Sequence, residues 1–334
     1  MRKIIFTLCF CLPFIAFCQE KLLTKKIVYD MDLKESVVKS DLKKDSVVYT
    51  YKVNQRFWWE AMDLVLDAWK SKKLNVRDEK GNALQWDSVQ KSLEKKITEV
   101  YKKKPNKKEM QRILENNITK IRFEEEWTYD VETMLIKKKI LAYCPIISLD
   151  TVVLVDDDLQ AKERFAFPLG WIRDAKAERN ESNLLITRNI HYTMPIYNYV
   201  PYRWWDNNLE EEYSLPFFDR MIERVLSLKT EAFETPDMTE AMQKKELQKR
   251  LMFTKNETVI ESSADGTEKE YEVVLNIDYT GADFDYLRFG EEIYFDVKNF
   301  GFIKNTNYIA PVIGKKAVGE SQTLYYPVFY LRKK

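Results

Sequence analysis

The chain has 334 residues, of which 45% are hydrophobic, and its 54 Lys and Arg residues balance 53 Asp and Glu residues. This apolar content supports a packed core, and the length suits one large domain or two ordinary ones. The balanced charge provides no overall field to attract nucleic acid. With only eight glycines and neither GxGxxG nor GxxxxGK[ST], the chain also lacks the usual nucleotide-binding loops.

The first 18 residues predict a secretory signal peptide. A basic start at Arg2 and Lys3 precedes the apolar run 4–17, and the small residues Ala16 and Cys18 stand at the −3 and −1 positions before Gln19. Cleavage there leaves a protein that works outside the cytoplasm. The alternative is a lipoprotein modified at Cys18, although Phe17 is unfavourable for that processing. In either case Cys144 is the single cysteine beyond residue 18, so an internal disulfide is excluded.

Residues 19–55 are polar with short apolar bursts, which indicates an extended segment that adds a strand to a sheet or to a partner. Three amphipathic helices are predicted next. The first begins at Asn54 or Gln55 and ends before the turn at 78–82. The second has Asp87 as its cap. In the third, Asn106 and Glu109 form a capping box after Pro105.

The hydrophobic period then changes to two, and residues 121–144 read as a β-hairpin. A four-residue loop would pair Tyr129 with Met134. That register places the acidic run 124–126 opposite the basic run 137–139, with Glu126 facing Lys137 and Glu125 facing Lys138. Pro145 is expected to end the hairpin.

Further strands and one helix complete the predicted order. A strand is expected at 151–155, a helix from Pro216, and β-strands around an Asp265-Gly266 turn. The fold class is therefore α+β: amphipathic helices with antiparallel β-hairpins, followed by a β-rich C-terminal region. We divide the chain into a signal peptide (1–18), an extended segment (19–55), an α+β domain (56–235) and a β-rich domain (245–334).

Few residues suggest chemistry, and we predict no catalytic residue, cofactor or metal. His191 is the single histidine, so HExxH is absent, and no GxSxG presents a nucleophilic serine. Cys144 lies in apolar surroundings and is interpreted as a small buried side chain. Residues 156–158 are three aspartates without the DxDxDG order of a calcium loop, and a solvated loop is favoured.

The aromatic stretch from Tyr192 to Trp205 has three interpretations. It belongs to the core, stacks sugar rings, or anchors a protein partner through large side chains. The sugar-binding interpretation gives an alternative function: a periplasmic carbohydrate-binding or carbohydrate-processing protein that uses Tyr197–Trp205, with Asp206 or Glu210 nearby.

Three stretches resemble the GldN/PorN family, which comprises periplasmic components of the type IX secretion and gliding machinery of Bacteroidota. They are the early helix 57–68, the strand pair 121–145 and the late segment 213–229. The strand pair carries the acidic run, Trp127 and Tyr129-Asp130. Ala142-Tyr143 departs from the family pattern, as does the tail after residue 240, so the chain is identified as a divergent member or a paralogue.

The resemblance implies a non-enzymatic structural subunit in the periplasm, peripherally associated with the outer membrane. It also implies an oligomeric ring assembled with an outer-membrane lipoprotein (GldK/PorK-like), and contact with the periplasmic region of an inner-membrane motor protein (GldM/PorM-like). The candidate interface residues are Trp127, Tyr129, Trp204, Trp205 and Phe217.

Overall fold

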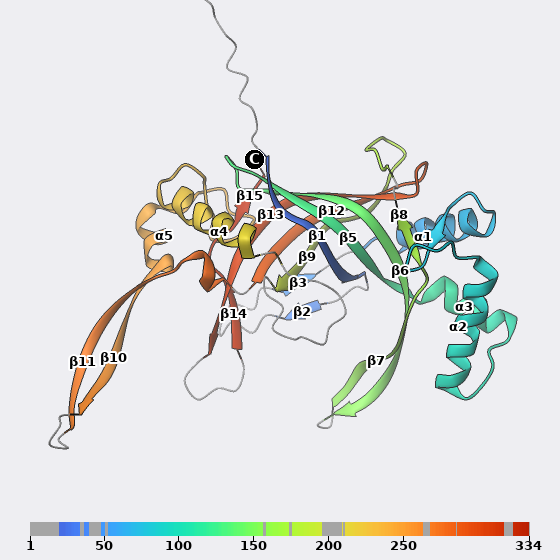
Figure 1. Ribbon diagram of the computed structural model, residues 1–334, viewed down its shortest axis with the longest axis horizontal. Coiled ribbons are helices and arrows are strands. Elements are labelled where there is room, and N and C mark those ends of the chain that lie inside the picture. The colour runs from blue at the N-terminus through green and yellow to red at the C-terminus, as the bar shows by residue number, and fades with distance from the viewer. Residues whose placement is uncertain are drawn as a thin grey trace, which may run out of the picture.

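The computed structural model confirms the α+β class (Figure 1). It describes residues 20–33, 37–39, 48–50, 53–155, 158–173, 176–195, 209, 211–262, 268–284, 286–316 and 323–333. The predicted signal peptide lies outside these residues. The helices are α1 (Gln55–Lys70), α2 (Trp86–Tyr101), α3 (Lys107–Asn116), α4 (Glu211–Leu226), α5 (Lys244–Leu251) and the 3-10 turn η1 (Gly281–Asp283).

The first large sheet is antiparallel and has the strand order β1-β5-β6-β8-β4, with β7 paired to β6. Its strands are β1 (Glu20–Asp32), β4 (Val76–Arg77), β5 (Ile118–Asp130), β6 (Ile136–Val155), β7 (Asp158–Pro168) and β8 (Trp171–Arg173). The prediction that the extended N-terminal segment adds a strand to a sheet is confirmed, because β1 runs along β5.

The second large sheet has the order β14-β13-β12-β9, with β15 paired to β13. Its strands are β9 (Leu184–Pro195), β12 (Tyr286–Asp296), β13 (Gly301–Lys316), β14 (Thr323–Pro327) and β15 (Leu331–Arg332). Two separate hairpins are β2 (Val37–Lys39) with β3 (Val48–Thr50), and β10 (Met252–Ser262) with β11 (Glu268–Asp278). The latter projects from the body of the molecule (Figure 1). The predicted Asp265-Gly266 turn lies outside the described residues.

The second sheet takes strands from both sides of the predicted boundary near 235–245. β9 comes before that boundary and pairs with β12, which comes after it. The main hydrophobic cluster of the described residues extends from Leu23 on β1 to Leu331 on β15. Strand pairing and core therefore unite the two predicted domains, and the division itself stays a prediction.

Local sequence determines the starts of α1 and α3. Asn54 caps α1 by accepting a hydrogen bond from the backbone N–H of Phe57 (3.2 Å), as predicted. The capping box of α3 is also confirmed: Asn106 Oδ1 accepts from the N–H of Glu109 (2.9 Å), and Glu109 accepts from the N–H of Asn106 (2.8 Å).

Two helix starts differ from the predictions. The N-cap of α2 is Gln85, which makes no side-chain cap bond, and Asp87 lies in the first turn instead. There its carboxylate faces the positive end of the helix dipole, which is the other favourable use of an acid at this end. α4 begins at Glu211, so Pro216 lies inside the helix rather than at its start.

The hairpin is confirmed as β5 and β6, but the predicted register is wrong by two residues. Tyr129 faces Ile136, and Glu126 faces Lys139, with 3.7 Å between their charged groups. The turn extends further than predicted because the Asp130 carboxylate accepts from the N–H groups of residues 132 and 133 (2.9 and 2.7 Å). Met134 completes the turn in the left-handed region, with φ 60°.

Pro145 does not end the hairpin, because β6 continues through it to Val155 and includes the strand predicted at 151–155. A proline cannot donate a backbone hydrogen bond, but its carbonyl still accepts one. Here the Pro145 carbonyl accepts from the N–H of Leu169 (2.9 Å), which follows β7.

Candidate functional site

The structure places three of the five predicted interface residues inside the chain. Trp127, Tyr129 and Phe217 are at most 4% exposed. The rings of Tyr129 and Phe217 meet edge to face, 4.8 Å apart, and so join β5 to α4. Side chains buried in this way pack the core and present no surface to a partner. Trp204 and Trp205 lie outside the described residues, as does the Tyr197–Trp205 stretch on which the carbohydrate-binding alternative depends.

The most distinctive cluster of polar groups is a pair of buried ion pairs between the two large sheets. Glu125 on β5 lies 2.7 Å from Lys304 on β13, and Lys138 on β6 lies 2.7 Å from Glu291 on β12. All four side chains are 0% exposed. Isolated buried charges are very costly, so burial of both signs in equal number is what makes the cluster tolerable.

Two tyrosines link the ion pairs into one network. Tyr29 on β1 donates its hydroxyl to Glu125 (2.9 Å), and Tyr192 on β9 donates to Glu291 (2.8 Å). The two hydroxyl oxygens lie 3.2 Å apart. We call Tyr29, Glu125, Lys138, Tyr192, Glu291 and Lys304 the inter-sheet network.

Further contacts satisfy the remaining donors. Lys304 Nζ donates to the Tyr29 hydroxyl (2.6 Å), and Lys138 Nζ donates to the Tyr192 hydroxyl (2.5 Å). The indole N–H of Trp127 donates to Glu125 (2.7 Å). Lys138 also lies over the ring of Trp127, 4.3 Å from its centroid, in a cation–π contact. The predicted interface residue Trp127 is therefore a supporting member of this network.

Burial and charge together set the protonation states. Burial by itself would raise the pKa of Glu125, but the ammonium groups of Lys304 and Lys138 outweigh it and lower that pKa. Burial lowers the pKa of Lys138 to about 8, against the opposing effect of Glu291 and Glu125. Burial and the nearby carboxylates raise the pKa of Tyr29, so its phenol stays neutral and can donate.

The network joins strands rather than presenting a reactive group. It ties β1, β5 and β6 of one sheet to β9, β12 and β13 of the other, and its charged groups are sealed from solvent. Fully satisfied buried polar networks of this kind rigidify a core and specify its arrangement. Its role in this fold is to fix the position of one sheet relative to the other.

Sequence reasoning missed this network because its partners are far apart in the chain. Lys304 is 179 residues from Glu125. The hairpin prediction assigned Lys138 to Glu125 across the ladder, whereas the structure pairs it with Glu291. The available signal was Lys304 itself, a lone lysine directly after Phe302 and Ile303 in a strand-like stretch.

Of the other reactive side chains, Cys144 is buried and His191 is partly buried. Cys144 is 0% exposed, and burial raises the pKa of its thiol to about 12, so the interpretation as a small buried side chain is confirmed. His191 contacts the Tyr308 hydroxyl, and burial lowers its pKa to about 4. Among the described residues, no three His, Cys, Asp or Glu side chains gather closely enough to hold a metal ion. Within the same residues, every helix is too short or too polar to span a bilayer.

Residues 23–181 match the model of a protein family described as "Gliding motility associated protein GldN". Residues 23–181, just under half of the chain, are therefore a GldN-family region. The matched region contains the early helix and the β5–β6 hairpin, on which the sequence resemblance rests, whereas the late segment 213–229 lies beyond it. No curated protein matches the chain.

The match also divides the inter-sheet network. Tyr29, Glu125 and Lys138 lie within the GldN region, and Tyr192, Glu291 and Lys304 lie beyond it. The strands after residue 181 therefore complete the core of the family region instead of standing apart from it.

Proposed function

We propose that this protein is a non-enzymatic structural subunit of a periplasmic protein-secretion and gliding-motility complex, a ring component of the type IX secretion system. It acts by protein–protein assembly. The observation that carries the proposal is the match of residues 23–181 to the GldN family.

The partners that fit this role are an outer-membrane lipoprotein of the secretion ring (GldK/PorK-like) and the periplasmic region of an inner-membrane motor protein (GldM/PorM-like). The export signal predicted at residues 1–18 supports a periplasmic location, peripheral to the outer membrane. The two-sheet core supports a mechanical role, since the inter-sheet network resists sliding of one sheet over the other.

Deletion of the gene with complementation tests this function. We expect the deletion strain to lose both spreading on agar and export of secreted proteins to the medium, and the wild-type gene to restore both. A deletion strain that spreads and secretes normally would contradict the proposal. If that strain instead failed to use a glycan, the carbohydrate-binding alternative would replace it.

A further inference from the structure

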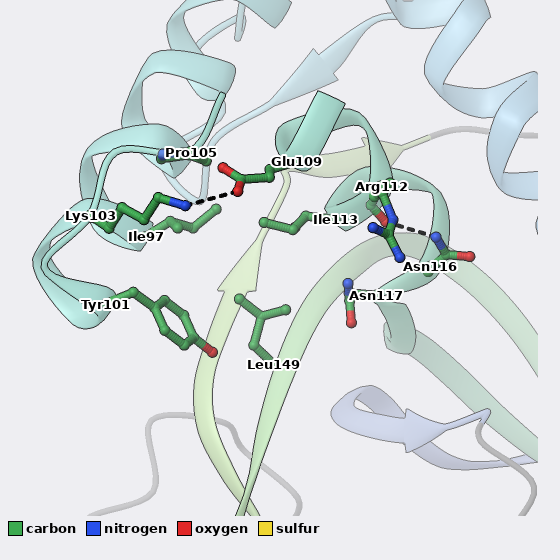
Figure 2. Close-up of a pocket in the computed structure, with 10 residues that line it drawn as sticks. All are labelled: Ile97, Tyr101, Lys103, Pro105, Glu109, Arg112, Ile113, Asn116, Asn117 and Leu149. Atoms are coloured by element: carbon green, nitrogen blue, oxygen red, sulfur yellow. Dashed lines mark hydrogen bonds and ion pairs between the residues drawn. The ribbon is translucent and has the colours of Figure 1, made fainter. Parts of the chain in front are cut away.

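A groove of about 470 Å³ opens between α2, α3 and the middle of β6 (Figure 2). It lies away from the inter-sheet network and shares no lining residue with it. Its volume falls within the range of about 300–1,000 Å³ that is usual for ligand sites, so it admits a large side chain with part of its backbone.

The floor of the groove is apolar. Ile97 on α2 and Leu149 on β6 are buried at its base, and Ile113 on α3 is partly buried beside them. At the mouth, Tyr101 keeps 39% of its surface exposed, which makes it one of the few large apolar side chains at the surface of the described chain. Such a floor favours an apolar side chain from a partner.

The rim of the groove is cationic. Between residues 102 and 112 there are six Lys or Arg residues and one acid, Glu109, whereas the whole chain is close to neutral. Glu109 neutralises Lys103 (3.0 Å), and Lys104 pairs with Glu94 (2.7 Å). Across the described parts of the chain, no carboxylate lies within ion-pair distance of the others, which are Lys102, Lys107, Lys108 and Arg112. Of these four, Arg112 lines the groove itself.

Arg112 is the rim cation placed to meet an occupant. It lines the groove on the side opposite Lys103, and its backbone carbonyl accepts a hydrogen bond from the Asn116 side chain (Figure 2). Arg112 is exposed and pairs with no carboxylate of the described residues, so its guanidinium is available for a bidentate contact with a carboxylate, the geometry that arginine favours.

We infer that this groove docks an acidic segment of a partner protein, which inserts one aromatic or aliphatic side chain over Ile113 and Leu149 and places a carboxylate on Arg112. This inference rests on the proposed assembly function and names a surface for it. Charge complementarity selects the partner: a carboxylate of an acidic segment meets Arg112 in the groove and further lysines on the adjoining residues 102–108, whereas a basic segment meets repulsion.

Selection of displayed random octapeptides against the full chain tests the inference. We expect the enriched peptides to carry two or more Asp or Glu residues around a Leu, Phe or Trp. The best of them, labelled with fluorescein, should bind the protein in an anisotropy titration, and its affinity should fall as the salt concentration is raised. Enrichment of basic peptides, or of none, would overturn the inference.

Matched variants locate the binding to the groove. Arg112→Glu should lower the affinity for the labelled peptide by about tenfold, as expected for loss of one charge-assisted contact. Tyr101→Ser should weaken it through loss of apolar contact. Lys91→Glu is the control, because it makes the same charge reversal at an exposed position of α2 that does not line the groove. The affinity of this variant for the peptide should stay within about twofold of wild type.

Two outcomes separate the groove from the wider function. If Arg112→Glu leaves peptide affinity unchanged while the wild-type chain still co-purifies with secretion proteins, the groove inference fails and the assembly function stands. If peptides bind as expected but the chain does not co-purify with secretion proteins, the groove inference holds and the assembly function fails. If the chain self-associates in sedimentation and Arg112→Glu abolishes that association, the occupant is a second copy and the acidic-partner inference is wrong.

Discussion

Removal of the Glu125 carboxylate is the sharpest test of the inter-sheet network. In Glu125→Leu, Lys304 would keep its buried charge without its counter-ion, and the Trp127 indole N–H would lose its acceptor. Breaking a buried ion pair costs about 3–5 kcal/mol. Since domains are stable by only about 5–15 kcal/mol, the variant should unfold at much lower urea concentration.

The assay is equilibrium urea unfolding, from which the free energy of unfolding is extrapolated to water. Lys139→Met is the control, because Lys139 is 71% exposed and lies 3.7 Å from Glu126 in the same hairpin. An exposed pair of this kind contributes about 0–1 kcal/mol.

A second substitution gives the decisive comparison. Replacing both ions, as Glu125→Leu with Lys304→Met, removes the unpaired charge and should recover a large part of the loss. If the free energy of unfolding of Glu125→Leu stays within about 1 kcal/mol of wild type, the range of ordinary substitutions, the buried ion pair does not stabilise the fold as described. The same holds if the losses from the two single substitutions simply add in the double variant.

Three further predictions follow from the same structure. The pKa of His191 is lowered to about 4 from an ordinary value of 6.5, so its neutral form stabilises the fold above pH 6.5 and that stability is lost as the pH falls towards 4. In urea unfolding at pH 7 and pH 4.5, the stability difference between wild type and His191→Phe should therefore shrink at the lower pH; a constant difference would show that His191 does not titrate on unfolding. Asn106→Ala removes the cap of α3 and should cost about 1 kcal/mol, measured by thermal unfolding, whereas an unchanged melting temperature would mean that the box with Glu109 contributes nothing. A chain that ends at residue 235 exposes the β9 edge that β12 covers and should aggregate, whereas a cooperative melt of 19–235 would support the predicted domain boundary.

The features predicted correctly from sequence are those fixed by neighbouring residues. The capping box at Asn106 needs only four residues, and the two strands of the hairpin follow from alternation over 121–144. The α2 start was less accurate, because Gln85 offers no side-chain cap signal and boundaries drift by one or two residues.

The remaining features depend on contacts across the fold. The register of the hairpin depends on the turn that the Asp130 carboxylate stabilises. A change of two residues in the length of that turn reassigns every cross-strand partner. A bulge between Glu124 and Glu125 then breaks the ladder, and Glu124 pairs with Arg173 on β8 (2.9 Å). Alternation places an acidic run on a strand, but it does not show that a lysine from a distant strand will bury one of its members.

Purification from native membranes is the most direct test of whether this protein works by assembly, as its GldN-family region leads us to propose. The tagged full chain would be extracted in mild detergent, and the proteins that accompany it would be identified and quantified. We predict recovery of a secretion-ring lipoprotein in comparable molar amount. Recovery of the protein alone, soluble and monomeric, would contradict the proposed assembly function.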